Sequence, residues 1–195
     1  VVYPFGYGLS YTTFQQVLDS VEVDMENRTI RAQATVTNTG MAAGKTSVQI
    51  YGQAPYIAGG VEKSAIQLLG FEKTGDLQPG ESVTLTMETE LEYLSSYDNA
   101  LGHEILDGGD YYFALGNGSH EALNRILADQ GYTRDNGMDA AVEKGQSVKW
   151  SYAPEGGRDT GTFERSKSGG TVEARLTEAD FNTWAPDTVT YLSRS

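Results

Sequence analysis

Cysteine is absent from the 195 residues of this chain. This absence excludes disulfide frameworks, thiolate nucleophiles and cysteine-ligated zinc sites, so stability has to come from packing. It leaves the compartment open between a bacterial cytoplasm and secretion, because a cysteine-free chain suits a reducing cytosol and also an exterior where disulfides are not used.

Positive charge is also scarce. The chain has 27 acidic and 14 basic side chains, a formal net charge of −13 and a sequence pI near 4.4. Such a chain is repelled by nucleic-acid backbones and by anionic membranes, and no stretch approaches the roughly 20 apolar residues that span a bilayer. The sequence therefore predicts neither a nucleic-acid partner nor a membrane partner.

The first ten residues, VVYPFGYGLS, lack the basic start and the uninterrupted apolar segment of a secretory signal. We therefore expect the chain to begin within a longer protein.

Catalytic and metal-binding residue patterns are few. The two histidines, His103 and His120, form no ligand-spaced pair, and we interpret them as surface or capping residues. Ser119 lacks the G-x-S-x-G elbow of a nucleophile. The acidic clusters DGGD (107–110) and RDNGMD (134–139) lack the alternating ligands of an EF-hand loop, which favours solvated turns. The sequence predicts no catalytic residue, no cofactor and no metal.

The stretch GMAAGKT looks like a phosphate-binding loop, which requires G-x-x-x-x-G-K-[ST] between a strand and a helix. Here only three residues separate Gly40 from Gly44, one fewer than the motif needs. The residues after Lys45 alternate as a strand does, so no helix N-terminus follows to meet an anion. We predict a turn and no nucleotide site.

What the sequence does contain is alternation of apolar and polar residues with a period of two, which predicts half-buried strands. It is clearest in TIRAQATVTN, which places Ile30, Ala32, Ala34 and Val36 on one face. Three further runs show it: KTSVQIY, ESVTLTM and YYFALG. Turn residues bound these runs, as in Asn38-Thr39-Gly40 and Gln78-Pro79-Gly80. Short strands at such intervals predict a β-sandwich.

One segment, SHEALNRILADQG, has helical spacing instead, with Ser119 as a possible N-cap and Gly131 as a possible end. Beyond it the chain is polar and glycine-rich, and only SVKWSY and GTVEARL look like short strands. We therefore predict an all-β, immunoglobulin-like β-sandwich with one short helix and a loop-rich extension. The predicted segments are a linker at 1–14, the sandwich at 15–118, and a helix with an irregular extension at 119–195.

Aromatic residues crowd the first 14 positions too densely for all of them to enter one core. Tyr3, Phe5, Tyr7 and Tyr11 are the residues that we predict to form a domain interface, because a clustered exposed apolar patch marks an interaction surface. The alternative is that they contribute to a ligand surface.

These motifs carry a resemblance to a known family. PFGYGLSYTTF resembles the segment that joins the second catalytic domain of glycoside hydrolase family 3 enzymes, the β-glucosidases and their relatives, to a fibronectin type III-like domain. The resemblance continues through that domain to about Gly118, in three further segments: VTNTGMAAGKTSVQIY, QLLGFEKTGDLQPGES and YLSSYDNALGHEILDGGDYYFALGNG. The stretches SHEALNRIL and TEADFNTWAPDTVTYLSRS resemble the extension of a subset in which the domain order is permuted.

The resemblance implies a retaining mechanism in the parent enzyme, with an Asp nucleophile and a Glu acid/base on catalytic domains whose motifs do not occur here. It implies that this chain is a non-catalytic accessory domain, inactive alone, whose partners are the catalytic domains of the same polypeptide, with a possible carbohydrate contact. The alternative is an independent carbohydrate-binding β-sandwich module that uses the tyrosine-rich start and Trp150 or Trp184 as stacking platforms.

Overall fold

The computed structural model describes residue 3 and residues 7–172 and 177–194. The chain divides into two compact units. The first, called here the sandwich unit, comprises Val1–Gln53, Ala65–Leu94 and Tyr111–Trp150. The second unit comprises Ala54–Ser64, Ser95–Asp110 and Ser151–Ser195.

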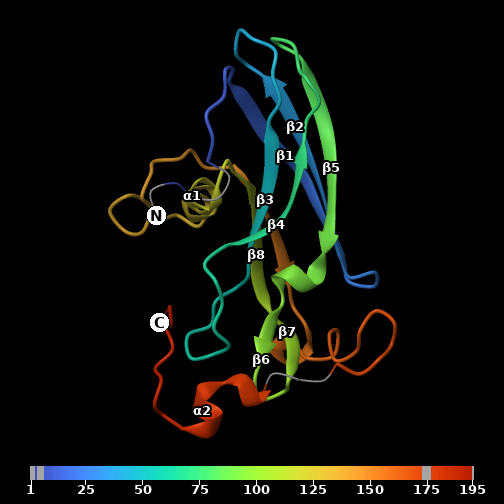
Figure 1. The fold of residues 1–195 in the computed structure, drawn as a ribbon, viewed down its shortest axis with the longest axis vertical. Helices are drawn as coiled ribbons and strands as arrows, with labels where there is room; N and C mark the ends of the chain where they lie inside the picture. Colours follow the sequence, from blue (N-terminus) through green and yellow to red (C-terminus); the bar gives the residue numbers. More distant parts are fainter. Residues whose placement is uncertain (1–2, 4–6, 173–176, 195) are drawn as a thin grey trace. The chain divides into compact units, whose positions relative to one another are not determined.

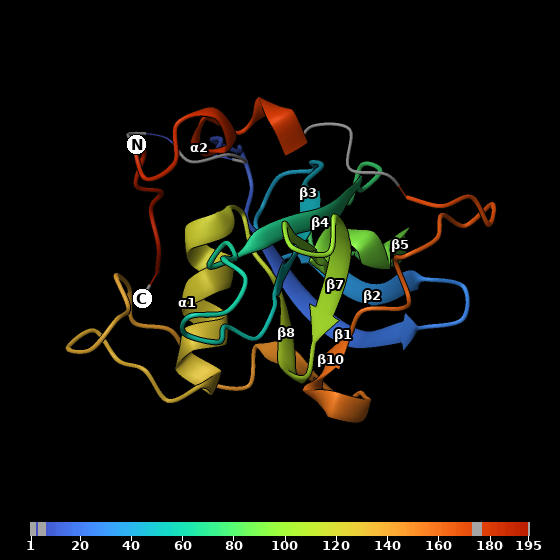
Figure 2. The ribbon, with the colours of Figure 1, turned by 90° about the horizontal axis from the view of Figure 1, so that it is seen from below.

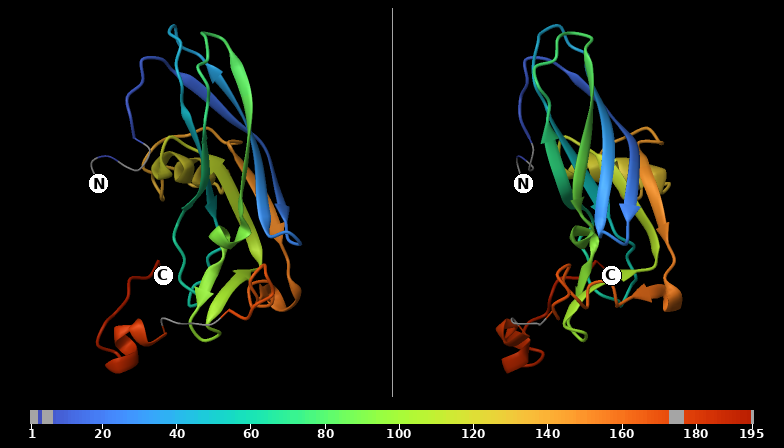
Figure 3. Two further views of the ribbon diagram at one scale, coloured as in Figure 1. Left: turned by 45° about the vertical axis from the view of Figure 1, so that its right-hand side comes forward. Right: turned by 90° about the vertical axis from the view of Figure 1, so that its right-hand side faces the viewer.

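One layer of the sandwich unit is a three-stranded antiparallel sheet in the order β1-β2-β5 (Figures 1 and 3). Its strands are β1 Phe14–Asp24, β2 Thr29–Asn38 and β5 Ser82–Glu90. The strand predicted from TIRAQATVTN has the bounds of β2, and all four apolar residues on its predicted inner face are at most 2% exposed. That prediction is confirmed.

The other layer has the strand order β4-β3-β8-β9. Its strands are β4 Gln67–Lys73, β3 Ser47–Gln53, β8 Gly109–Leu115 and β9 Ser147–Tyr152. The runs KTSVQIY, YYFALG and SVKWSY are confirmed as strands, and the β-sandwich fold class with them. The predicted boundaries at residues 14 and 118 remain predictions.

The central strand β3 is buried on both faces, because helix α1, Ser119–Asp129, packs on the outer side of its sheet (Figure 2). Tyr51 of β3 and Ala114 of β8 form a cluster with Ala122 and Ile126 of α1. The inner face of the same strand contributes Val48 and Ile50 to the core. A fully buried strand therefore lies where alternation alone predicted a half-buried one.

Strand β1 was not among the runs predicted from alternation. Its pairing with β2 shifts register between Leu18 and Ser20, so one extra residue interrupts the period of two. The sequence FQQVLDSVEVD therefore lacks a continuous alternation although it forms an 11-residue strand.

The start of α1 differs from the prediction, and its end agrees with it. Gly118 is the N-cap, and the hydroxyl of Ser119 makes no capping hydrogen bond, so the predicted Ser119 cap is wrong. Instead Glu121 reaches back from the first turn, and its Oε2 accepts from the backbone N–H of Asn117 at 2.9 Å. Gly131, at φ +91°, follows the last turn as predicted.

Asn38, at the end of β2, is fully buried and connects four segments of the sandwich unit. Its Nδ2 donates to the carbonyls of Ala42 and Leu77, each at 2.8 Å, and its Oδ1 accepts from the Thr12 hydroxyl at 2.8 Å. Oδ1 also accepts from the backbone N–H of Gly40 at 3.0 Å. A Cβ on Gly40 would lie 2.1 Å from Thr12 Oγ1, which is why the turn Asn38-Thr39-Gly40 needs glycine there.

The loop after α1 is held by side chains of that helix. The buried amide of Asn124 exchanges hydrogen bonds with Asp139, which also accepts from Nδ1 of His120 at 2.9 Å. Further along, Asp129 accepts from the backbone N–H of Ser147 at 2.8 Å, at the start of β9. The polar segment between helix and strand is thus fixed at both of its ends.

The second unit is loop-rich, and it combines residues 151–195 with two segments from within the predicted sandwich range, 54–64 and 95–110. It contains a small sheet in the order β10-β7-β6, made of β6 Ser96–Asp98, β7 His103–Asp107 and β10 Arg158–Asp159. A four-residue helix, α2 Phe181–Trp184, lies near its end, with Asp180 as the N-cap. The predicted strand GTVEARL falls partly on residues 173–176, outside the described residues.

We predict that Asn38→Ala lowers the free energy of unfolding by roughly 2–4 kcal/mol, because it leaves buried carbonyls and the Thr12 hydroxyl without their partner. Asn99→Ala is the matched control, because Asn99 is exposed and should change stability by no more than about 0.5 kcal/mol. Urea unfolding followed by circular dichroism measures both variants. Equal midpoints for the two would contradict the role assigned to Asn38.

The hydrogen bonds donated by His120 and Asn124 hold the pKa of Asp139 below its ordinary value. Because the folded-state pKa is the lower one, this carboxylate stabilises the fold above its unfolded pKa of about 3.9 and loses that effect as pH falls through the folded pKa. We expect His120→Ala to raise the pKa of Asp139, measured from its carboxyl carbon by NMR titration. An unchanged midpoint would show that the His120 contact does not exist in solution.

Candidate functional site

The aromatic N-terminal segment is exposed where the structure describes it. Tyr3, Tyr7 and Tyr11 are 66%, 55% and 103% exposed, and Leu9 is 93% exposed. The rings of Tyr3 and Tyr7 contact each other at 4.7 Å between centroids. Phe5, the fourth residue of the predicted interface, lies outside the described residues. Three tyrosines of the predicted interface are therefore displayed on the surface of this chain.

The segment is attached to the sandwich unit directly after Tyr11. Thr12 is buried and donates to Asn38, and the carbonyl of Thr13 accepts from the backbone N–H groups of Thr39 and Gly40. The chain thus changes from an exposed aromatic segment to a fixed strand within two residues.

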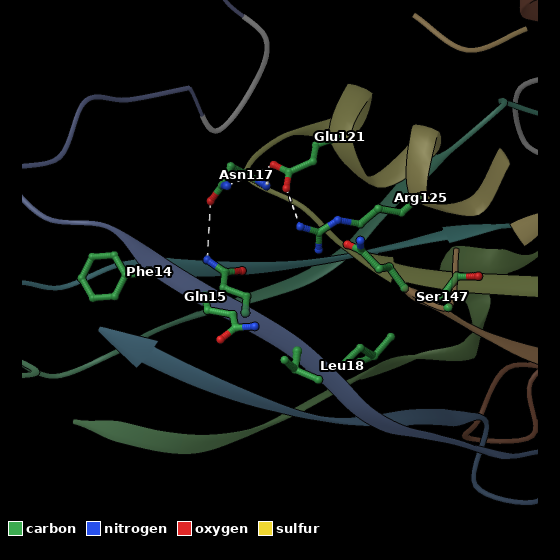
Figure 4. A pocket seen from close by; sticks show the side chains of 11 residues that line it. Phe14, Gln15, Leu18, Asn117, Glu121, Arg125 and Ser147 are labelled. Carbon is green, nitrogen blue, oxygen red and sulfur yellow. Dashed lines mark hydrogen bonds and ion pairs between the residues drawn. The ribbon is translucent and has the colours of Figure 1, made fainter. Parts of the chain in front are cut away.

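A pocket of about 480 Å³ lies between β1 and the N-terminal half of α1, within the sandwich unit. Figure 4 shows Phe14, Gln15 and Leu18 on β1, with Glu121 and Arg125 projecting from α1. Eleven residues line it: Phe14, Gln15, Gln16, Val17, Leu18, Asn117, Glu121, Arg125, Gly145, Gln146 and Ser147.

A connected set of hydrogen bonds fixes one wall of this pocket. Arg125 donates from one terminal nitrogen to Glu121 at 2.5 Å and from the other to the carbonyl of Leu115 at 3.1 Å. Glu121 also accepts from the side-chain amide of Asn117 at 3.0 Å, and Gln16 Nε2 lies 3.5 Å from Asn117 Oδ1. The charged groups of the lining therefore form one internally neutralised ion pair, and several amides lie beside it.

Sequence reasoning missed this pocket. Its two sides, β1 and α1, are about 100 residues apart in the chain, and glutamine side chains form no recognisable motif. The i, i+4 spacing of Glu121 and Arg125 was visible as a helical ion pair, but nothing in the sequence placed glutamines opposite it.

Asp107, the first residue of the acidic cluster at 107–110, belongs to an ion-pair network in the second unit, so the predicted solvated turn is wrong at this residue. Asp107 is fully buried and accepts from Lys63 and, at 2.7 Å, from Arg158 Nε. Arg158 also contacts Asp98 at 3.1 Å. Because a buried carboxylate is costly unless it is paired, these contacts indicate a structural role that joins β7, β10 and the 54–64 segment.

The other residues considered from sequence occupy ordinary positions. His103 begins β7, and its Nδ1 lies 2.9 Å from the Glu104 carbonyl. His120 lies on α1 and pairs with Asp139 of the loop that follows this helix. The GMAAGKT stretch leads into β3, and Lys45 pairs with Asp76 at 3.3 Å, which confirms the turn. Trp150 packs on buried Tyr111 with ring centroids 5.0 Å apart.

Two kinds of feature are absent from the described part of the chain. No helix there is long and apolar enough to cross a bilayer. In the same residues no group of three or more histidine or acidic side chains is placed to hold a metal ion.

Comparison with known proteins shows which proteins this chain is similar to. Residues 46–119 match the family model for the fibronectin type III-like domain. Beta-glucosidase A of Butyrivibrio fibrisolvens is 41% identical over 135 residues, which cover 60% of this chain and 16% of that protein.

Solved structures show the same similarity to β-glucosidases. The β-glucosidase of Kluyveromyces marxianus superposes with a TM-score of 0.60 at 29% identity, over 79% of this chain and 16% of that one. The GH3 β-glucosidase of Bifidobacterium adolescentis gives 0.53 at 31% identity, over 63% and 18%. The chain spans less than a fifth of each of these relatives. It carries a fibronectin type III-like domain, and it is similar over this domain and its flanks to part of the glycoside hydrolase family 3 β-glucosidases.

Proposed function

We propose that this chain is an accessory, non-catalytic part of a family 3 β-glucosidase, an enzyme that hydrolyses terminal β-glucosides with retention of configuration. In this proposal it braces the catalytic domains of the same polypeptide through its aromatic N-terminal segment. The single observation that carries the proposal is the exposure of Tyr3, Tyr7 and Tyr11 on a segment that is fixed to the sandwich at Thr12.

Physical chemistry supports an interface role for these residues. Exposed aromatic side chains that lie close together mark contact surfaces, and tyrosine is enriched in such surfaces because its ring packs while its hydroxyl stays hydrogen-bonded. Attachment at Thr12 and Thr13 limits the conformational freedom of the segment, so less entropy is lost when it docks.

The pocket of the sandwich unit gives no support to catalysis by the chain itself. A retaining glycosidase needs two carboxyl groups about 5–5.5 Å apart on either side of the sugar. The β1–α1 pocket is lined by a single carboxylate, Glu121, which is paired with Arg125. We therefore propose that the chain alone does not hydrolyse glucosides.

The test is reconstitution. This chain is mixed with the catalytic part of its parent enzyme, and complex formation is measured together with hydrolysis of an aryl β-glucoside. We expect association, and we expect the double variant Tyr7→Ser, Tyr11→Ser to weaken it by about tenfold or more, since buried interface aromatics dominate binding energy. Tyr93→Ser is the matched control, because Tyr93 is exposed on a 3-10 turn far along the chain.

Three outcomes would contradict the proposal or a part of it. Folded parts that do not associate would remove the bracing role, and glucoside hydrolysis by this chain alone, above a matched blank, would remove the accessory role. Equal weakening by the Tyr93 control would assign the effect to general surface damage and would leave the aromatic segment without a specific function.

The independent carbohydrate-binding module remains the alternative, with Trp184 as its best stacking platform because that ring is 69% exposed. Titration with a soluble β-glucan separates the two functions. Under the bracing proposal we expect Trp184→Ala to leave any glucan affinity unchanged. Saturable glucan binding that disappears in Trp184→Ala would favour the module.

A further inference from the structure

We propose that the pocket between β1 and α1 binds a neutral saccharide of one or two hexose units. The volume of about 480 Å³ lies within the range of roughly 300–1,000 Å³ that is typical of small-molecule sites. The inference does not depend on the bracing role, because the pocket lining does not include Tyr3, Tyr7 or Tyr11.

The charge of the pocket lining indicates which class of ligand it can bind. The two ionised side chains in the lining, Glu121 and Arg125, neutralise each other at 2.5 Å, and the remaining nine lining residues carry no charge. A phosphate or carboxylate ligand would meet the Glu121 carboxylate without a surplus of positive charge, and a cation would find one carboxylate that is already paired. The pocket therefore favours a neutral polar ligand.

The hydrogen-bonding groups of the pocket lining favour a polyhydroxylated ligand among the neutral polar molecules. Oε1 of Gln16 is buried and accepts no hydrogen bond from the described residues, which leaves an acceptor that needs a partner. Arg125 has five N–H donors, and the contacts among the described residues use two of them. Gln15 and Gln146 add amides whose side chains make no hydrogen bond within the described chain.

A sugar hydroxyl both donates and accepts, so neighbouring hydroxyls can pair with a lining that offers both amide donors and amide acceptors. Hydrogen bonds to the ionised Arg125 and Glu121 are stronger than those between neutral groups. The apolar side chains of Phe14 and Leu18 lie on the β1 side of the same pocket, where they can contact the C–H groups of a sugar ring (Figure 4).

The polar wall is also preorganised. Asn117 is held by two hydrogen bonds to Glu121, and Ser147 is held by Asp129, which accepts from its backbone N–H and from its hydroxyl. Groups that are fixed before binding lose little freedom when the ligand arrives, which favours affinity for a small ligand.

The experiment titrates the 195-residue chain with D-glucose and with cellobiose and follows the side-chain amide signals of glutamine and asparagine by NMR. We expect saturable shifts with a dissociation constant on the order of 1 mM for glucose, in line with the affinity available to a ligand of this size. D-Glucuronate, which has a similar ring and a negative charge, should bind at least about tenfold more weakly because of Glu121.

Two variants assign binding to this pocket. Gln15→Leu removes an exposed amide without a structural partner, so it should fold normally and weaken glucose binding several-fold. Arg125→Met should weaken binding by about tenfold or more, since it removes a charged donor. Arg31→Ala on β2 is the matched control, lies outside this lining, and should bind glucose as the unaltered chain does.

Each outcome of these titrations either supports the proposal or overturns it. Saturable binding that both pocket variants weaken and Arg31→Ala does not would support the proposal. Absence of saturable shifts up to roughly 100 mM sugar, or binding that is indifferent to Gln15 and Arg125, would overturn it. The same variants should associate normally with the catalytic part of the parent, so loss of sugar binding and loss of bracing are separate results.

Discussion

The buried side chain of Asn38 is the interaction on which the arrangement of the sandwich unit and its N-terminal segment depends. Its amide group makes hydrogen bonds with the backbone N–H of Gly40, with the carbonyls of Ala42 and Leu77, and with the hydroxyl of Thr12. These groups are polar and removed from water, so each would be costly without this partner. The same contacts fix where β1 begins, and therefore where the exposed aromatic segment leaves the sandwich.

Placing β1 has a second consequence, because this strand carries one side of the β1–α1 pocket. The helix that carries the other side is fixed against the outer face of β3 by Tyr51, Ala122 and Ile126. Neither element forms the pocket alone. Two surfaces of different chemistry therefore follow each other along the chain. The exposed tyrosines lie before Thr12, and the pocket amides of β1 lie after it.

Alternation was sufficient to predict β2 with its bounds and inner face, and to locate β3, β5 and β8. It failed for β1, because the bulge at Leu18/Ser20 interrupts the period, and it failed for the Ser119 cap, because Glu121 serves that end of the helix instead. The pocket could not be predicted, since it depends on side chains from distant segments that only tertiary packing brings together. The exposure of the tyrosines could be predicted, because aromatic residues are too dense near one end of the chain for all of them to enter one core.

The central claim is that the aromatic segment is a docking surface, and amide hydrogen exchange tests it most directly. Exchange at residues 7–13 is compared between this chain and the longer β-glucosidase to which we propose that it belongs, with β2 as the internal reference. We expect slower exchange of these amides in the longer enzyme and unchanged exchange in β2. Equal exchange of residues 7–13 in the two proteins would show that the tyrosines stay exposed, and it would contradict the claim.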